Sequence, residues 1–292
     1  MKILFYDDFK LGVLKDRHVV DASPLLEDLD TSTPQNTLQS MITRFKEKEP
    51  QLVAIAEKNH GVPVESVRIR QPVPRPQVLL CAITNYMEGV GKRPEPDFFL
   101  KSPYSIIGDG DTVVLPSQEA QIFHHEAELA VVMSKSAEHL GESEAMDYVF
   151  GYTGFIDVSA RGLSRSYFKN KSFHTFAPLG PVIVTKDEIP DPYDLDVKMW
   201  VNGQPRHDYN TGDMANRIPR LLEEATAVTR LDTGDVVCTG TNHQGIGPLQ
   251  DGEEVVLEIE KIGRLTVHVR DDKKRKWAFG IDQEMARKVR EF

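Results

Sequence analysis

Hydrophobic and polar residues alternate along most of this chain with a period of two, the pattern of half-buried β-strands. Residues 1–30 contain the runs KILFYDD, KLGVLKD and HVVDAS, which predict two or three small antiparallel strands. From residue 77 onward strand-like runs dominate: QVLLCAIT, DTVVLP, AELAVVM, GPVIVT, LDVKMWVNGQPRH, GDVVCTGT, EEVVLEIEKIG and RLTVHVRD. Asn202 and Gly203 stand between two strand-like stretches and predict a tight hairpin turn, because both residue types tolerate positive φ.

Helical spacing is confined to a few segments. The apolar residues between Leu38 and Phe45 predict a helix that breaks near Pro50, and a second short helix follows and ends at Gly61. Two further helices are predicted at 142–150 and 216–229. Because these helices are scattered among mostly antiparallel strands, the pattern favours an α+β fold over a doubly wound parallel sheet.

A proline-rich stretch, VPVESVRIRQPVPRPQ, separates the mixed first part of the chain from the strand-rich remainder. We therefore expect a small N-terminal domain at 1–65, an extended connection at 66–77 and a larger domain at 78–272. The lysine-rich run RDDKKRKW predicts a charged, solvated C-terminal tail at 273–292.

Composition limits the partners. The formal net charge of −10 argues against a nucleic acid or an anionic membrane, since both require a cationic surface, and it favours a small ligand or a metal cation. Asp7, Asp8 and Lys10 interrupt the apolar start that a signal peptide needs, and a cytoplasmic protein is predicted. Cys81 and Cys238 lie in apolar runs without a nearby cysteine and are expected to be buried free thiols.

The stretch FHHEAELAVV, residues 123–132, concentrates titratable groups against a hydrophobic run. A zincin helix is excluded, because that motif needs a second histidine four residues after the first and Leu129 stands there after His125. As a strand, the stretch places His124, Glu126 and Glu128 on one face. Two neighbouring glutamates repel each other unless water or a cation screens them, so an exposed strand face and a hard-cation site are both open.

Further candidate groups follow in the sequence. Asp157 ends an apolar strand and could supply a third carboxylate, while Lys171, His174 and Thr175 precede a Pro-Leu-Gly-Pro turn. The loop CTGTNHQGIGP offers backbone amides and hydroxyl groups to an anion. None of these segments identifies a reaction by itself.

The order of six segments resembles the fumarylacetoacetate hydrolase family: FFLKSPYSIIGDGDTVVLP, FHHEAELAVVM, GYTGFIDVSAR, KSFHTFAPLGPVIVT, VNGQ and GDVVCTGTNHQGIGP. The resemblance runs from Val78 to Val269. It implies a mixed β-sandwich roll with a small N-terminal α/β cap domain, assembled as a homodimer.

The resemblance also implies roles for individual residues. The metal site of the family falls on Glu126, Glu128 and Asp157. Lys171 matches a family lysine beside the metal and is assigned a catalytic role. The expected substrate-binding residues are Lys101, Arg161, Thr175 and Thr241.

Such a site predicts enolate chemistry. Three carboxylates suit Mg²⁺, with Mn²⁺ or Ca²⁺ as alternatives, and leave coordination positions for a 2-oxo or β-diketo acid. A metal acting as a Lewis acid stabilises an enolate, and Lys171 would add positive charge near the developing oxyanion. Carbon–carbon bond hydrolysis, decarboxylation and tautomerisation share that intermediate, so the reaction type stays open.

The chain departs from the family in the lid segment. Members carry N-Y-x-x-H with a glutamate three residues later, and here Asn85 and Tyr86 match while Gly89 and Lys92 replace the histidine and the glutamate. The usual general base is therefore missing. A metal-binding protein without turnover is the alternative to an enzyme, whereas a cupin-like barrel is disfavoured because it needs more histidine ligands.

Three residues are candidates to replace the missing base. His124 shares the predicted face of the glutamates, and His174 lies in the K-S-F-x-T motif, where the family has aspartate or glycine. Both are predicted as catalytic residues, with Glu88 as a weaker candidate.

Overall fold

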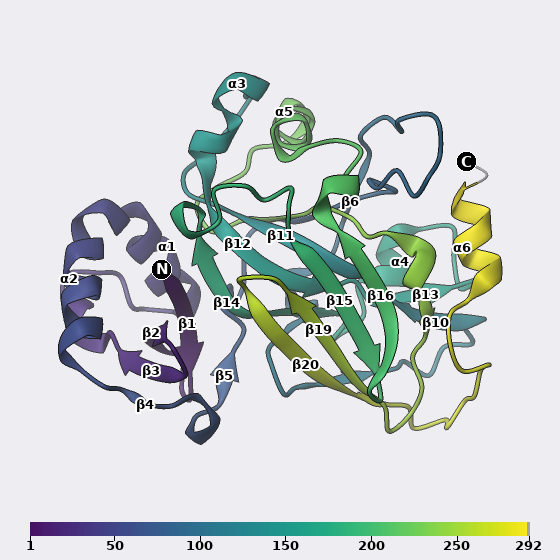
Figure 1. Cartoon of the computed structure of the whole chain (residues 1–292), viewed down its shortest axis with the longest axis horizontal. Coiled ribbons are helices and arrows are strands. Elements are labelled where there is room, and N and C mark those ends of the chain that lie inside the picture. Colours follow the sequence, from purple (N-terminus) through teal and green to yellow (C-terminus); the bar gives the residue numbers. More distant parts are fainter. Residues whose placement is uncertain (291–292) are drawn as a thin grey trace.

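A large mixed sheet runs through the molecule, and the other layers pack against it (Figure 1). The computed structural model describes residues 1–290, with side chains up to residue 288. Within that range the sheet has twelve strands, ten of them in the order β4-β3-β2-β1-β14-β12-β11-β17-β6-β7, while β5 pairs with β1 and β8 with β14. Its strands are β1 Lys2–Tyr6, β2 Lys10–Lys15, β3 His18–Asp21, β4 Val62–Pro63, β5 Ile69–Arg70, β6 Leu79–Ala82, β7 Phe98–Leu100, β8 Ile106–Ile107, β11 Ala127–Met133, β12 Val149–Ile156, β14 Ala177–Thr185 and β17 Val236–Cys238.

Two smaller sheets complete the β-structure of the described residues. One has the order β16-β15-β19-β20-β9, and the other has the order β13-β10-β18. Their strands are β9 Thr112–Val114, β10 Ile122–His125, β13 Ser159–Arg161, β15 Asp196–Val201, β16 Gln204–Asn210, β18 Gly247–Pro248, β19 Glu254–Ile259 and β20 Gly263–Arg270.

The large sheet is buried on both faces. Alternate residues of β11 point to opposite sides, so that Leu129 and Val131 join one hydrophobic cluster and Ala130 and Val132 join another. The first cluster contains the inward side chains of β15, β19 and β20, and the second contains those of helices α1 and α2. This sandwich confirms the predicted α+β class and explains why every residue of β11 is buried, with Glu128 as its one charged side chain.

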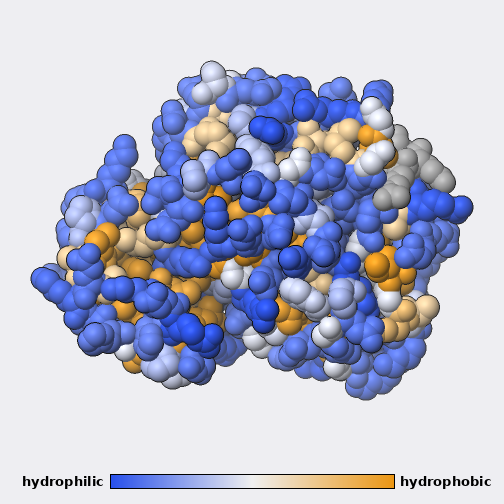
Figure 2. Space-filling view, viewed as in Figure 1, coloured by the Kyte–Doolittle hydropathy of each residue, from blue (hydrophilic) through white to orange (hydrophobic). Residues whose placement is uncertain are grey.

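Helices cover the sheets and their edges. In Figure 1, α1 and α2 lie with the N-terminal strands at the left, and α6 lies at the opposite end of the molecule. Their bounds are α1 Pro34–Thr43, α2 Phe45–Lys58, α3 Glu142–Ala145, α4 Tyr167–Lys171, α5 Ile218–Val228 and α6 Gln283–Arg290. Over the described residues, no helix is both long and apolar enough to cross a membrane, and the face drawn in Figure 2 is mainly hydrophilic.

Local signals explain several elements. The hairpin between β15 and β16 turns at Asn202 and Gly203, which have φ angles of 50° and 74°. Helix α1 begins after Thr33, whose side chain accepts a hydrogen bond from the Asn36 amide, and Pro34 occupies its first position. The thiols of Cys81 and Cys238 are buried and free, as predicted.

The predicted helix break at Pro50 is wrong. The two helices meet at Arg44, and α2 continues through Pro50, because Leu52 and Ala56 beyond it are buried and hold the helix against the sheet. The predicted helix at 142–150 is also too long. It ends at Ala145, and β12 has begun by Phe150, which is buried in the central sheet.

The lysine-rich segment after β20 exposes Lys273, Lys274 and Lys276, but it is anchored to the domain. Arg275 pairs with Asp271 and donates to the carbonyl groups of Pro116 and Gln118, at 2.7 and 2.8 Å. Trp277 donates from Nε1 to the Gln121 carbonyl at 2.6 Å. These bonds hold the segment against the domain and lead it to α6.

Candidate metal centre

Three buried carboxylates meet where β10, β11 and β12 come together. Glu128 belongs to β11, Asp157 follows β12, and the Asp157 amide donates to the Glu126 carbonyl at 2.9 Å. One carboxylate oxygen from each residue lies within 4.8 Å of the others. The single strand expected across this stretch is in fact two, because the chain leaves the small sheet at His125 and joins the large sheet at Ala127.

Two lysines contact this cluster, one at each carboxylate oxygen of Asp157. Lys171 pairs with Asp157 and lies 3.1 Å from Glu126 Oε2. Lys101 pairs with the other oxygen of Asp157 and donates to the carbonyl groups of Val158 and Phe176, at 3.1 and 2.7 Å. Lys101 is buried, and its amino group faces the protein and Asp157 rather than open space.

Arg161 and His124 form a second layer around Glu126. The Arg161 guanidinium pairs with Glu126, and its Nε donates to His124 Nδ1 at 3.2 Å. His124 Nε2 lies 3.0 Å from Asp282. Burial, followed by the charge of Arg161, lowers the pKa of His124 to about 4, so the ring is neutral at pH 7. Because both ring nitrogens have partners, His124 orients Arg161 in this structure.

The charges on the three carboxylates are unequally compensated. Burial alone would raise the pKa of Glu126, but the nearby charges of Lys171 and Arg161 hold it well below its usual range. Burial and the carboxylates of Asp157 and Glu126 raise the pKa of Glu128 well above its usual range. Among the described residues, the hydrogen-bond donor to Glu128 is the Gly240 amide, at 2.9 Å. A buried acidic group with so little compensation fits a hard divalent cation.

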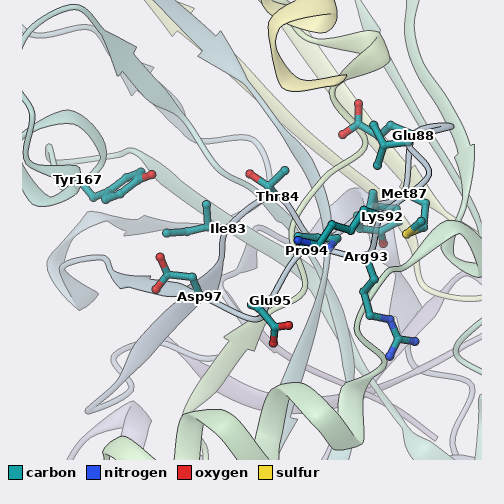
Figure 3. Close-up of a pocket in the computed structure, with 12 residues that line it drawn as sticks. Ile83, Thr84, Met87, Glu88, Lys92, Arg93, Pro94, Glu95, Asp97 and Tyr167 are labelled. Atoms are coloured by element: carbon teal, nitrogen blue, oxygen red, sulfur yellow. The ribbon is translucent and has the colours of Figure 1, made fainter. Parts of the chain in front are cut away.

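A pocket of about 210 Å³ opens onto this cluster, lined by Ala82, Ile83, Thr84, Phe99, Glu126, Arg161, Tyr167, Lys171, Thr241, His243 and Met285. It adjoins a second cavity of about 420 Å³, and both cavities contact Ile83, Thr84 and Tyr167. Figure 3 shows the second cavity, with Tyr167 and Ile83 at one end and Lys92 and Glu88 at the other. Together the two spaces can accept a small acid with a substituent.

Other predicted site residues have different surroundings. Thr241 lines the pocket with Lys171. The Thr175 hydroxyl accepts from the Val114 amide at 2.8 Å and so holds neighbouring backbone. His174 is exposed and is not one of the residues that line the pocket.

Sequence reasoning missed His243 and Met285. Both line the pocket, although His243 lies 117 positions after Glu126 and Met285 belongs to the C-terminal helix. His243 could have been found, because it is the one titratable side chain besides Cys238 in the predicted anion-binding loop CTGTNHQGIGP. No comparable signal marks Met285.

Gly245 permits close packing of this loop against β16. A Cβ atom at this position would lie 2.5 Å from the Arg206 carbonyl oxygen and 2.6 Å from His207 Cα. We expect Gly245→Ala to displace Thr241 and His243, to lower turnover at least tenfold, and to destabilise the fold by about 2 kcal/mol. Steady-state kinetics and urea unfolding would measure both effects.

Gly141→Ala is the matched control, because the nearest atom to its Cβ would be 4.0 Å away. Equal turnover in the two variants would contradict the proposed role of loop packing.

Buried histidines should destabilise the protein in acid. Burial, and then the neighbouring His243, lower the pKa of His207 from 6.5 to about 4. The unfolded chain therefore binds more protons between these pH values, and the free energy of unfolding falls as the pH decreases from about 6.5 to about 4. Urea unfolding of the metal-free protein across this range would measure the slope.

His207→Asn can keep the hydrogen bond that Nδ1 makes with the Asn242 carbonyl at 3.0 Å, but it removes the titration. We expect its slope to be smaller by about 1 kcal/mol per pH unit. An unchanged slope would show that His207 does not contribute.

Sequence comparison identifies related proteins. The family described as fumarylacetoacetate (FAA) hydrolase, C-terminal, matches residues 79–270. Maleylpyruvate hydrolase of Aquipseudomonas alcaligenes is 30% identical over 288 residues, covering 92% of this chain and 99% of that protein. A mitochondrial oxaloacetate tautomerase of Homo sapiens is 34% identical over 249 residues, covering 78% of this chain and 79% of that protein.

Structural comparison agrees with the sequence. Maleylpyruvate hydrolase from Sphingobium sp. SYK-6, in complex with manganese(II) and pyruvate, superposes with a TM-score of 0.85 at 32% identity. The match covers 93% of this chain and 99% of that one, so it includes the N-terminal segment as well as the central sandwich.

Proposed function

The chain is an enzyme of the fumarylacetoacetate hydrolase family, and we propose that it hydrolyses a carbon–carbon bond in a small 2,4-dioxo acid with a divalent cation. Glu126, Glu128 and Asp157 would hold the cation. The observation that carries this proposal is a cluster of three buried carboxylates beside a pocket that Glu126 and Lys171 line. The two maleylpyruvate hydrolases that match over more than nine-tenths of the chain support hydrolysis.

A bound divalent cation supplies Lewis acidity that favours the enolate form of a 2-oxo acid. The residues of the chain supply the surroundings. Lys171 adds a fixed positive charge next to Glu126 and Asp157, where a substrate oxyanion would be stabilised. Arg161, 23% exposed at its side chain, can bind a substrate carboxylate from the pocket wall.

The second cavity provides room for the acyl substituent. It presents apolar surface from Ile83, Met87 and Val90 together with the charged side chains of Lys92 and Arg93. A substrate with its 2-oxo acid end at the carboxylate cluster would place its tail there.

Tautomerisation of oxaloacetate is the second candidate. The specific support is the 34% identity to a human enzyme of that name over 78% of this chain. The reaction needs enolisation and proton transfer but no water attack, so the same carboxylates and Lys171 could serve it.

The test begins with protein stripped of metal by a chelator. We expect it to be inactive, to bind Mg²⁺ or Mn²⁺ in calorimetry, and then to consume a 2,4-dioxo acid with release of pyruvate. Oxaloacetate, followed by its enol absorbance, tests the second candidate in parallel. Absence of metal binding would overturn both candidates, and metal binding without turnover of either acid would overturn the two proposed reactions but not the metal site. Mg²⁺ as the cation used and a homodimeric state stay predictions.

A further inference from the structure

A buried carboxylate–histidine pair joins a residue that lines one cavity to a residue that lines the other. Glu88 Oε1 is 2.7 Å from His243 Nδ1, although the residues are 155 positions apart in the sequence. Glu88 lines the larger cavity, and His243 lines the smaller one with Glu126, Arg161 and Lys171. The pair therefore connects the lid segment with the loop that follows β17.

Glu88 is fixed by further hydrogen bonds. Its Oε1 accepts from the His243 backbone amide at 3.0 Å, and its Oε2 accepts from the Gln244 side-chain amide at 2.6 Å. The Gln244 amide also donates to the Ala286 carbonyl of α6 at 3.2 Å. A buried carboxylate with this many donors is held as an anion in one orientation.

The backbone turns Glu88 inward. Glu88 and Gly89 have φ angles of 49° and 82°, and the Val90 amide donates to the Met87 carbonyl at 2.7 Å across the turn. The Glu88 amide donates to the Asp213 carboxylate at 3.0 Å. In Figure 3 the Glu88 carboxylate points away from Lys92, at the far end of the cavity from Tyr167. This turn lies in the lid segment.

The hydrogen-bond partners of the two ring nitrogens define which nitrogen carries the proton in neutral His243. Because the Glu88 carboxylate accepts at Nδ1, the neutral ring carries its proton there, and Nε2 on the opposite side holds a lone pair. The imidazole side chain is 11% exposed, and it borders the pocket that contains Glu126 and Lys171. No described residue makes a hydrogen bond to Nε2.

We propose that His243 transfers the proton in catalysis and that Glu88 positions it, replacing the histidine–glutamate pair lost at Gly89 and Lys92. The proposal rests on the proposed function, since it assigns the base for that reaction. It differs from the sequence predictions, in which His124 and His174 were the catalytic histidines. His124 has partners at both nitrogens, and His174 is exposed away from the pocket.

His243 alone can accept the proton from water and return it to the product. In hydrolysis, Nε2 takes a proton from water while the water oxygen bonds to C4 of the 2,4-dioxo acid. The C3–C4 bond then breaks, its electron pair forms the enolate of pyruvate, and the C4 carbonyl re-forms as a carboxylic acid. The imidazolium returns its proton to C3, which gives pyruvate and regenerates the neutral ring.

Pyruvate alone tests the second half of this reaction, the proton transfer between His243 and C3. In D₂O, Nε2 would remove a proton from C3: the C–H electron pair becomes the C2–C3 double bond, and the carbonyl π pair moves to oxygen. The imidazolium then exchanges this proton for a deuteron from D₂O, and return of the deuteron to C3 restores pyruvate with one C–D bond. The exchange is followed by proton NMR, and it requires no knowledge of the natural substrate.

Four proteins are compared in this assay with saturating Mg²⁺ or Mn²⁺. They are the wild type, His243→Asn, Glu88→Gln and the control His60→Asn, which alters an exposed histidine at the end of α2. Asparagine at 243 can keep the donor to Glu88 while it removes Nε2, so the loop stays anchored. Calorimetry with metal and pyruvate, and thermal unfolding, are measured for each protein.

We expect His243→Asn to reduce exchange and turnover at least about a hundredfold, the usual contribution of a general base. Glu88→Gln should reduce exchange about tenfold or more, with pyruvate affinity unchanged, which a merely structural role would not produce. In a His243→Ala variant, added imidazole should restore part of the exchange. Rescue of His243→Ala by imidazole tests the role of the ring even when His243→Asn folds poorly.

Wild-type exchange in His243→Asn would overturn the inference and leave the proposed function intact. Loss of metal and pyruvate binding in that variant, without rescue by imidazole in His243→Ala, would also overturn it. A wild-type protein that binds neither metal nor pyruvate would instead overturn the proposed function, and the inference with it.

Discussion

Replacing Glu128 by glutamine is expected to reduce turnover by about a thousandfold or more, because a metal centre contributes several kcal/mol of transition-state stabilisation. Glutamine has nearly the same shape as glutamate and can still accept the hydrogen bond from the Gly240 amide. It removes one of three negative charges from the proposed metal site. Calorimetry should show a matching loss of Mg²⁺ and Mn²⁺ affinity.

The same substitution should not destabilise the metal-free protein. Burial and the adjacent carboxylates raise the pKa of Glu128, so the folded state prefers the neutral group. Its favourable contribution is present at low pH and is lost as the pH rises through the raised pKa of the folded state. A neutral glutamine does not undergo this loss, and we expect its chelator-treated unfolding midpoint at pH 7 to equal or exceed that of the wild type.

Glu57→Gln is the control for Glu128→Gln, since Glu57 is an exposed acidic residue on α2. It should leave metal affinity and turnover unchanged. If Glu128→Gln retained wild-type metal affinity, Glu128 would not be a ligand and the proposed centre would be wrong.

Replacing Lys171 by methionine should lower turnover by about a hundredfold to a thousandfold, the range for loss of one preorganised group that stabilises an oxyanion. Burial alone would lower the pKa of Lys171, but the carboxylates of Asp157 and Glu126 raise it to about 12. The ammonium is therefore charged at every pH at which the enzyme would be assayed. The loss in turnover should persist when substrate is saturating.

The metal-free Lys171→Met protein should be less stable by about 3 kcal/mol, because two buried carboxylates lose a shared partner. The effect thus has the opposite sign to that of Glu128→Gln, although both substitutions should impair turnover. Urea unfolding in the presence of a chelator would measure it.

Lys169→Met is the matched control for Lys171→Met, since Lys169 is an exposed lysine on the same short helix, α4. It should leave turnover and stability unchanged. A stable Lys171→Met protein with full turnover would contradict the proposed charge balance.

Local patterns predicted the strands, whereas the family resemblance predicted which carboxylates meet. The strand β11 and the hairpin at Asn202 and Gly203 follow from the alternation of residues and from turn chemistry, which depend only on neighbouring residues. The family resemblance added Asp157 to the predicted site of Glu126 and Glu128, and in the structure the three carboxylates lie together. Their role as metal ligands stays a prediction.

Tertiary packing decided the helix boundaries and the ends of the chain. Pro50 does not end α2, because buried residues on both sides hold the helix, and the charged run before α6 is fixed by carbonyl groups more than 150 positions away. Sequence patterns report the preference of a segment alone, whereas these contacts depend on which distant surfaces meet.

The sequence by itself determined the oxygen-rich cluster and the absence of the usual lid base. Only the tertiary structure decided which groups surround that cluster. Lys101 reaches Asp157 across 56 positions, and Glu88 meets His243 across 155 positions. The physical reason is that a hydrogen bond is specified by the positions of two side chains in space, and sequence spacing carries that information only within one helix or strand.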